Sequence, residues 1–384
     1  MSPSEDNQTN RSSRIDSVSR RDALRTLGAT TIAGGSLFTS TASAAPSTTE
    51  VPALLRRDEV VEYMEVPKDW LQHREHAREA KAKLLKQLGD DDNVFSIGLV
   101  GQETKFGKKK GLKIRVQVQD KLSTASVPTA TDDIPVTTEA APTNHGPAGC
   151  HNSSDESSAG GGELVGWTNG GWGTATCAVV HDPGGSEEDR LLHCAHVFWD
   201  DCNDAKNGDI TGRGAHRGRN NGGTKIGEVS TYDRKGDYVL IEERNGGSFM
   251  SYIDDNNDYP SVGGRVSETK IDSMATSSGE DVYNMGVTTG LTTGQIVSSD
   301  KSFTFTCMNF HDEGVESTTN FANGDSGSPC YVLRDGDAYI THVGSYRYYD
   351  RDGIKTCSGD TAQQGNAVGT AGYYIQNNEN ISFD

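Results

Sequence analysis

Short runs of apolar residues, separated by glycine, asparagine and aspartate, recur along the chain from residue 163 onward. Within these runs the apolar positions are either continuous or alternate with polar ones, and no run has the length of an ordinary helix. Examples are residues 177–180, 238–241, 295–297, 303–305 and 338–340. Many short strands joined by frequent turns are typical of an all-β barrel or sandwich. We therefore predict an all-β fold for residues 163–384.

A different pattern precedes this region. Apolar residues recur at roughly helical spacing among charged ones over residues 60–88, and Pro67 interrupts them, which predicts two helices within residues 50–90. Residues 94–100 and 112–118 alternate as strands do, with a basic turn between them. Together these elements predict a small α+β module over residues 50–123.

Residues 124–162 interrupt both patterns. They are rich in threonine, serine, proline, alanine and glycine, and they show no periodicity. This composition predicts a flexible linker, or a long loop that a protease could cut.

The first 45 residues have the order of parts found in an export signal. A twin arginine, Arg20-Arg21, precedes a weakly apolar segment over residues 24–38, and Ala42-Ser43-Ala44 supplies the small residues that signal peptidase needs. The whole resembles a twin-arginine (Tat) signal, which implies that the folded protein is secreted. No cysteine lies near the cleavage site, so no lipid anchor is predicted. Residues 1–45 are therefore not part of the predicted fold.

The charge balance excludes several classes of ligand. Lysine and arginine number 36 against 55 aspartate and glutamate, so the net charge is 36 − 55 = −19. Nucleic acids and anionic lipids both require a basic surface, so neither is a predicted partner. No apolar run reaches 18 residues, which argues against a transmembrane helix.

The acidic residues are spread along the chain, for example at Glu187-Glu188-Asp189 and Asp200-Asp201. A hydrated acidic surface suits concentrated salt, because the ions screen its self-repulsion. An ordinary acidic secreted protein is the alternative. No acidic run has the ligand spacing of an EF-hand loop, and no metal or cofactor is predicted.

Three short segments of the β region carry residues suited to nucleophilic catalysis. They are residues 191–197, which reach His196, residues 235–241, with Asp237 before an apolar strand, and residues 323–329, with Ser326 between glycines. A serine hydroxyl attacks well when an imidazole accepts its proton and a buried carboxylate orients that imidazole. The glycines permit a turn that points the N–H groups of Gly324 and Ser326 at a developing oxyanion.

Two neighbours could replace members of this set. His193 lies two residues before His196, and Asp233 lies close to Asp237. We favour His196 because it stands at the end of its strand, and Asp237 because Asp233 lies in a charged turn.

These segments resemble the chymotrypsin-fold (trypsin-like) serine proteases. Gly-Asp-Ser-Gly-Ser-Pro at 324–329 resembles the family's nucleophile motif, although the family usually has glycine at the place of Ser328. Ala195-His196-Val197 and Asp237 resemble its histidine and aspartate segments. Gly-Val-Thr-Thr-Gly-Leu-Thr-Thr-Gly-Gln-Ile at 286–296 resembles a strand of its streptogrisin-like members. The resemblance covers residues 163–384 and implies two six-stranded antiparallel β-barrels with the active site in the cleft between them.

The resemblance also implies roles for residues around this site. Asp325 would be buried and would shape the oxyanion hole through an ion pair. His342, Val343 and Gly344 would belong to the strand that lines the substrate pocket. In glutamyl endopeptidases a histidine in this strand helps to bind an acidic side chain, whereas an uncharged pocket wall is the alternative here.

The predicted export bears on the cysteines. Seven are present, and none forms a C-x-x-C pair, so a zinc ribbon is not indicated. Export favours disulfide bonds, and the odd number leaves at least one thiol unpaired or paired between molecules. Cys177 with Cys194 and Cys307 with Cys330 are candidate pairs, although the family usually places its second cysteine just after the histidine.

The sequence therefore predicts a secreted, salt-adapted serine endopeptidase that is a monomer and acts on proteins or peptides. Residues 50–123 are either a removable pro-region or an accessory domain that stays attached. A catalytically idle binding protein on the same scaffold, and an esterase that uses the same triad, are the alternative functions.

Overall fold

The computed structural model describes residues 47–384, apart from positions 90, 92, 119–126, 141–157, 168–170, 219–222, 255–258, 278, 306–307 and 356–360. The predicted export signal lies outside the described residues. Among the described residues, no helix combines the length and the apolar character that crossing a bilayer requires.

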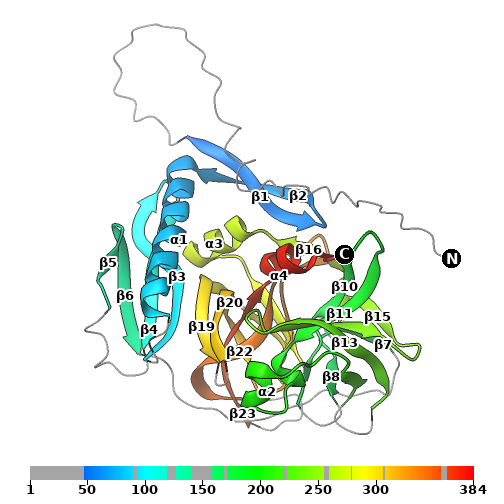
Figure 1. Ribbon diagram of the computed structural model, residues 1–384. Coiled ribbons are helices and arrows are strands. Elements are labelled where there is room, and N and C mark those ends of the chain that lie inside the picture. The colour runs from blue at the N-terminus through cyan, green and yellow to red at the C-terminus, as the bar shows by residue number, and fades with distance from the viewer. Residues whose placement is uncertain are drawn as a thin grey trace, which may run out of the picture. The chain divides into compact units, whose positions relative to one another are not determined.

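The chain begins with a β-hairpin rather than with a helix. Strand β1 (Thr48–Arg56) pairs antiparallel with β2 (Glu59–Pro67), and helix α1 (Lys68–Leu88) follows directly (Figure 1). The prediction of two helices in residues 50–90 is therefore wrong for the first of them. Along this segment partly buried and exposed residues alternate, with Val60 and Met64 on the more buried face, as in a strand. Pro67 does not separate two helices but caps α1, with a φ of −61°.

Helix α1 covers a small sheet that extends into the predicted linker. Strand β3 (Val94–Phe106) pairs with β4 (Lys109–Val118), and β4 pairs in parallel with β6 (Ile134–Ala140), which in turn pairs with β5 (Ala130–Thr131). Ile134 and Val136 are buried beside Leu84 of α1. The ordered module thus reaches residue 140, because two alternating apolar residues outweigh the polar composition around them. We call residues 47–140 the N-terminal module.

The first barrel of the β region holds the histidine and aspartate segments. Its strands follow the order β24-β10-β11-β14-β13-β12-β8-β9. Strand β9, at one end of this path, and β10, next to the other end, are consecutive in the chain. The elements of this region are β7 (Ser158–Gly161), β8 (Leu164–Trp167), β9 (Trp172–Thr174), β10 (Cys177–His181), β11 (Glu188–Cys194), a 3-10 turn (His196–Phe198), α2 (Cys202–Asn207), β12 (Gly214–Arg217), β13 (Lys225–Asp233), β14 (Tyr238–Glu243), β15 (Ser248–Ile253) and β24 (Ile381–Ser382).

The second barrel holds the serine segment. Its strands run in the order β18-β17-β21-β22-β23-β20-β19, and β18 and β19 at the two ends are again consecutive in the chain. Beyond β19 the same sheet continues into β3 and β4 of the N-terminal module. The elements are β16 (Val262–Val266), α3 (Glu268–Thr276), β17 (Val282–Gly286), β18 (Gly290–Gly294), β19 (Ile296–Phe305), β20 (Met308–Phe321), β21 (Pro329–Arg334), β22 (Asp337–Lys355), β23 (Thr361–Ala371) and α4 (Gly372–Glu379).

The two barrels share a hydrophobic core. Val179 and Leu240 of the first barrel pack in one buried cluster with Met285 and Ile340 of the second. Burial of such side chains is the main stabilising contribution to the fold. The predicted all-β fold with two barrels and a preceding α+β module is confirmed, and the segments joined by this core carry the candidate site.

Candidate active site

Pairing between β11 and β14 brings His196 to Asp237. Cys194, the last residue of β11, lies opposite Tyr238, the first residue of β14. One step beyond, the His196 N–H donates to Oδ1 of Asp237 at 2.8 Å. The ring atom Nδ1 lies 2.8 Å from Oδ2 of the same carboxylate. A fully buried carboxylate thus holds the imidazole through both its ring and its backbone.

This contact sets the protonation of the histidine. Burial by itself lowers the pKa of His196, but the Asp237 carboxylate raises it and prevails, so the pKa lies well above the ordinary imidazole value. An imidazole held in this way is a good acceptor for a proton from a nearby hydroxyl.

The neighbouring candidates have other hydrogen-bond partners. His193 is fully buried, and its Nδ1 accepts the N–H of Cys194 at 2.8 Å. Burial lowers the pKa of His193 to about 4, so the ring is neutral at ordinary pH. Asp233 accepts the N–H of Lys235 in an exposed turn. The structure therefore joins His196 to Asp237, as predicted from their places along the strands.

The serine segment forms a tight loop between β20 and β21. Gly324 and Gly327 have φ values of +100° and +94°, which glycine adopts without strain. Asp325, Gly327 and Ser328 donate their N–H groups to carbonyls of the loop and of Gly344. Within the described residues, the N–H groups of Gly324 and Ser326 have no acceptor, so they can receive an oxyanion.

Asp325 is held by backbone amides rather than by a cation. Its Oδ1 accepts the N–H groups of Thr288 and Thr289 at 2.8 and 3.2 Å, and Oδ2 accepts that of Ala322 at 2.8 Å. Burial raises the pKa of Asp325 to about 6, although these donors lower it. The predicted ion pair is wrong: among the described residues, no cation contacts this carboxylate. The backbone N–H groups of Thr288 and Thr289 instead bind the Asp325 carboxylate.

Thr174 and Thr176, which the sequence analysis did not identify, attach the serine loop to the first barrel. The Thr174 N–H donates to the Ser326 carbonyl at 2.7 Å, and its hydroxyl donates to the Gly324 carbonyl at 2.8 Å. The Thr176 hydroxyl donates to the Gly327 carbonyl at 2.6 Å. No local pattern marks these threonines, because their partners lie about 150 positions away in the chain.

The docked loop lies beside the histidine segment. A Cβ at Gly173 would stand 2.2 Å from the Ser326 carbonyl oxygen and 3.0 Å from a methyl group of Val197, the residue after His196. The Nε2 atom of His196 lies 3.9 Å from the sulfur of Cys194. Among the described residues the Ser326 hydroxyl forms no hydrogen bond, a state common in sites without substrate.

The predicted pocket strand is mostly closed to solvent. His342 is fully buried, its Nδ1 lies 3.0 Å from the Thr341 hydroxyl, and burial lowers its pKa to about 3. Val343 belongs to the core shared by the barrels. Neither side chain therefore forms an open pocket wall, because both point into packed interior. Gly344 pairs with the serine loop through Gly327 and Ser328.

The proposed disulfide bonds are wrong for the described cysteines. Cys177, Cys194 and Cys330 are all free thiols. Cys177 lies in the core between the barrels, whereas Cys194 lies in the core of the first barrel, so their side chains do not meet. Cys330 donates to Oδ1 of Asn284 at 3.3 Å, and its proposed partner Cys307 lies outside the described residues.

One cluster has the composition of a metal site. Ligand atoms of Cys194, His196 and Asp237 lie within 4.8 Å of one another. The histidine and aspartate of this cluster already bind each other, which leaves the arrangement suited to proton transfer.

Replacement of Gly324 by alanine is expected to lower kcat for the predicted hydrolysis by on the order of 100-fold or more. The added Cβ would stand 2.3 Å from the Trp172 ring and 2.5 Å from the Thr288 hydroxyl, so the loop and its N–H groups must shift. Gly336→Ala is the matched control, because its φ is +91° and nothing lies within 4 Å. Equal loss in both variants would contradict the assignment of Gly324 to the oxyanion hole.

Comparisons with known proteins find structural neighbours but no family. No family model matches the chain, and no curated protein matches it. Among solved structures, a chymotrypsin of Cellulomonas bogoriensis is similar at 16% identity and a TM-score of 0.40, over 59% of this chain and 98% of that one. The MamO protease domain of Magnetospirillum magneticum is similar at 11% identity and a TM-score of 0.31, over 56% and 94%. Similarity this low identifies no family, so the strand order and the geometry described above carry the assignment of the site.

Proposed function

We propose that this protein is a serine endopeptidase in which Ser326 is the nucleophile. The observation that supports this most strongly is the buried Asp237 carboxylate on His196, in a barrel to which Thr174 docks the serine loop. In the proposed reaction the Ser326 hydroxyl oxygen attacks the peptide carbonyl carbon while its proton passes to Nε2 of His196. Asp237 stabilises the imidazolium that results.

The next steps use the same groups. The N–H groups of Gly324 and Ser326 bind the oxyanion of the tetrahedral intermediate. His196 returns the proton to the leaving amine as the C–N bond breaks, which leaves an acyl-enzyme on Ser326. Water then attacks the ester, with His196 again as the base, and releases the acid.

A thiol mechanism is less well supported. Cys194 lies beside His196, but it is fully buried, and burial raises the pKa of its thiol. A neutral, inaccessible thiol is a poor nucleophile. Ser326 is partly exposed and lies in a loop with two unused N–H donors.

A fluorophosphonate probe tests the proposal directly. We expect the probe to label Ser326, as mapped by peptide mass spectrometry, and to abolish casein hydrolysis in molar salt. Absence of labelling in folded protein would favour the idle binding scaffold. Labelling with turnover of small esters but no cleavage of peptides would favour the esterase.

We also propose that the enzyme is secreted through its twin-arginine signal. Replacing Arg20 and Arg21 by lysine is expected to keep the precursor inside the cell, as detected by immunoblot of cells and medium. Unchanged secretion of the double variant would contradict this route.

The acidic surface is proposed to be an adaptation to salt. Surface acids such as Glu103 and Glu187 are well exposed, at 94% and 61% of their side chains, so ions reach them easily. Dilution from molar salt to below about 0.5 M is expected to lower the melting temperature, because weaker screening strengthens the repulsion among acids. Equal melting temperatures in the two conditions, measured by circular dichroism, would refute the adaptation.

A further inference from the structure

Helix α1 presents buried cations to carboxylates of the second barrel. Arg74 and Arg78 place their Nε atoms 2.6 and 3.0 Å from Oδ2 of Asp272 in α3. Lys81 places its Nζ 3.0 Å from Oδ1 of Asp300 in β19. The Asp272 side chain is fully buried, and the side chains of Arg74 and Lys81 are only 4% and 5% exposed.

A second buried cluster joins β4 to β20. Glu316 of β20 is fully buried and binds Arg115 of the N-terminal module and Lys301 of β19, the latter at 2.6 Å. Asn366 donates to its other oxygen at 2.9 Å. Burial raises the pKa of Glu316, but the two cations lower it and prevail, to about 2, so this carboxylate stays charged.

These pairs cross from one part of the chain to the other. Among the described residues, both cations within ion-pair distance of Asp272 come from α1. Breaking a buried pair by removing one partner leaves an uncompensated charge, which is strongly unfavourable. The buried carboxylate of Asp272 in the second barrel therefore depends on the cations of the N-terminal module for its charge compensation.

The module also covers two strand edges. Strand β3 pairs with β19, with Leu99 opposite Ser299, and β1 pairs with β16, with Leu54 opposite Val266. Leu54 is buried in the same cluster as Val266 and Ile271 of the β region. Without the module, both edges would expose unpaired backbone groups.

We propose that the face formed by α3, β19 and β20 is a binding surface for a basic helix, and that its permanent occupant is this chain's own N-terminal module. The module then remains part of the working protein. A cut within residues 141–157 yields two chains that stay associated, and residues 158–384 alone lack part of the surface that supports β20. Because β20 leads directly into the serine loop, this surface also supports the candidate site. The proposal does not depend on hydrolysis by Ser326.

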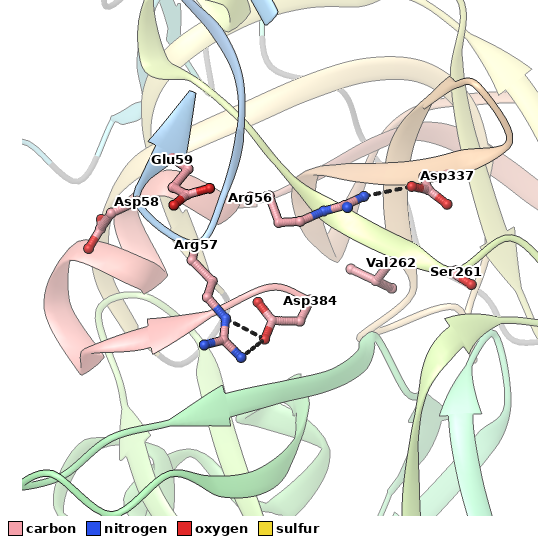
Figure 2. A pocket seen from close by; sticks show the side chains of 8 residues that line it. All are labelled: Arg56, Arg57, Asp58, Glu59, Ser261, Val262, Asp337 and Asp384. Atoms are coloured by element: carbon pink, nitrogen blue, oxygen red, sulfur yellow. Dashed lines mark hydrogen bonds and ion pairs between the residues drawn. The ribbon is translucent and has the colours of Figure 1, made fainter. Parts of the chain in front are cut away.

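The exposed contacts between the same two parts provide a control. Arg56 reaches Asp337 at 2.7 Å and Arg57 reaches Asp384 at 2.6 Å, beside an open hollow of about 770 Å³ (Figure 2). Arg56 and Asp337 are 51% and 36% exposed. Water and salt screen such pairs, so they add little to association.

The test uses full-length protein with Ser326→Ala, to prevent self-cleavage, and a site for a sequence-specific protease placed within residues 141–157. After complete cutting, we expect both pieces to elute together in size-exclusion chromatography at about 0.2 M and 2 M salt, because buried pairs are poorly screened. Separation of the pieces would overturn the proposal, whether or not residues 158–384 keep their strands.

Substitutions then show which ion pairs hold the two pieces together. In the cut protein, Arg78→Met is expected to weaken association on the order of 100-fold or more. Arg56→Met is expected to change it less than about fivefold. Equal effects of the two would overturn the role of the buried pairs. If the Arg78→Met protein does not fold before cutting, amide hydrogen exchange is measured instead, in the cut protein that keeps Arg78. Lasting protection of the β19 and β20 amides from exchange supports the proposal, and loss of that protection overturns it.

Discussion

Replacement of Ser326 by alanine is expected to reduce kcat/KM for peptide hydrolysis by roughly 10⁴- to 10⁶-fold. The substitution removes the attacking oxygen but leaves the fold intact, because the loop is held by backbone contacts. The Ser326 carbonyl still accepts the Thr174 N–H, and Asp325 still accepts its three amides. Steady-state kinetics on a fluorogenic peptide, with melting curves for both proteins, would measure this effect.

Two control variants separate the possible nucleophiles. Ser328 lies in the same motif, but its buried hydroxyl donates to Asn284, so Ser328→Ala is expected to affect stability more than chemistry. Cys194→Ala removes the thiol beside His196 and is expected to retain most of the activity. Loss of activity in Cys194→Ala, with activity retained in Ser326→Ala, would assign the reaction to the thiol instead.

Asp237→Asn is expected to lower kcat by on the order of 10⁴-fold. Asparagine tolerates the φ of +47° at this position, so the turn is kept. The carboxylate, however, accepts two hydrogen bonds from His196, one from its backbone and one from its ring. An amide offers only one acceptor oxygen, so either the backbone contact is lost or the imidazole takes the wrong tautomer.

The same variant has a pH signature. The reaction needs neutral His196, so activity rises with pH through the pKa of this residue. Because Asp237 raises that pKa, the acidic limb of kcat/KM in the wild type is expected above the ordinary value of about 6.5. In Asp237→Asn the limb should move to lower pH, because the raising charge is gone. A limb that does not move would show that another group titrates.

Local patterns in this chain indicate its strands, whereas contacts between distant segments leave no local pattern. The short strands of the β region follow from alternating or continuous apolar runs, and these were predicted correctly. The first helix of residues 50–90 was not, because the nine residues of β2 contain adjacent apolar pairs such as Val60-Val61, and helical spacing is easily read into such a short stretch. The predicted linker of residues 124–162 was wrong for β5 and β6 in the same way, since Ile134 and Val136 are too few to stand out from polar neighbours.

The contacts that a buried residue makes were harder to predict than its burial. Asp325 was correctly expected to be buried, but its partners are the amides of Thr288, Thr289 and Ala322. Backbone donors leave no trace in composition, so the sequence suggested a cation. The cysteines misled for a related reason: the predicted export suggested disulfide bonds, whereas a bridge needs two side chains that meet in the folded core.

The linear sequence specifies which chemical groups this protein has and where strands can form. It placed His196, Asp237 and Ser326 at strand ends and turns, where glycine and aspartate permit left-handed backbone. Which of these groups meet depends on the folded arrangement of the sheets. This arrangement joins Arg74 to Asp272 across 198 positions and Thr174 to Gly324 across 150. Such contacts depend on the packing of whole sheets, and hydrophobic burial, which drives that packing, has no direction that a local pattern could record.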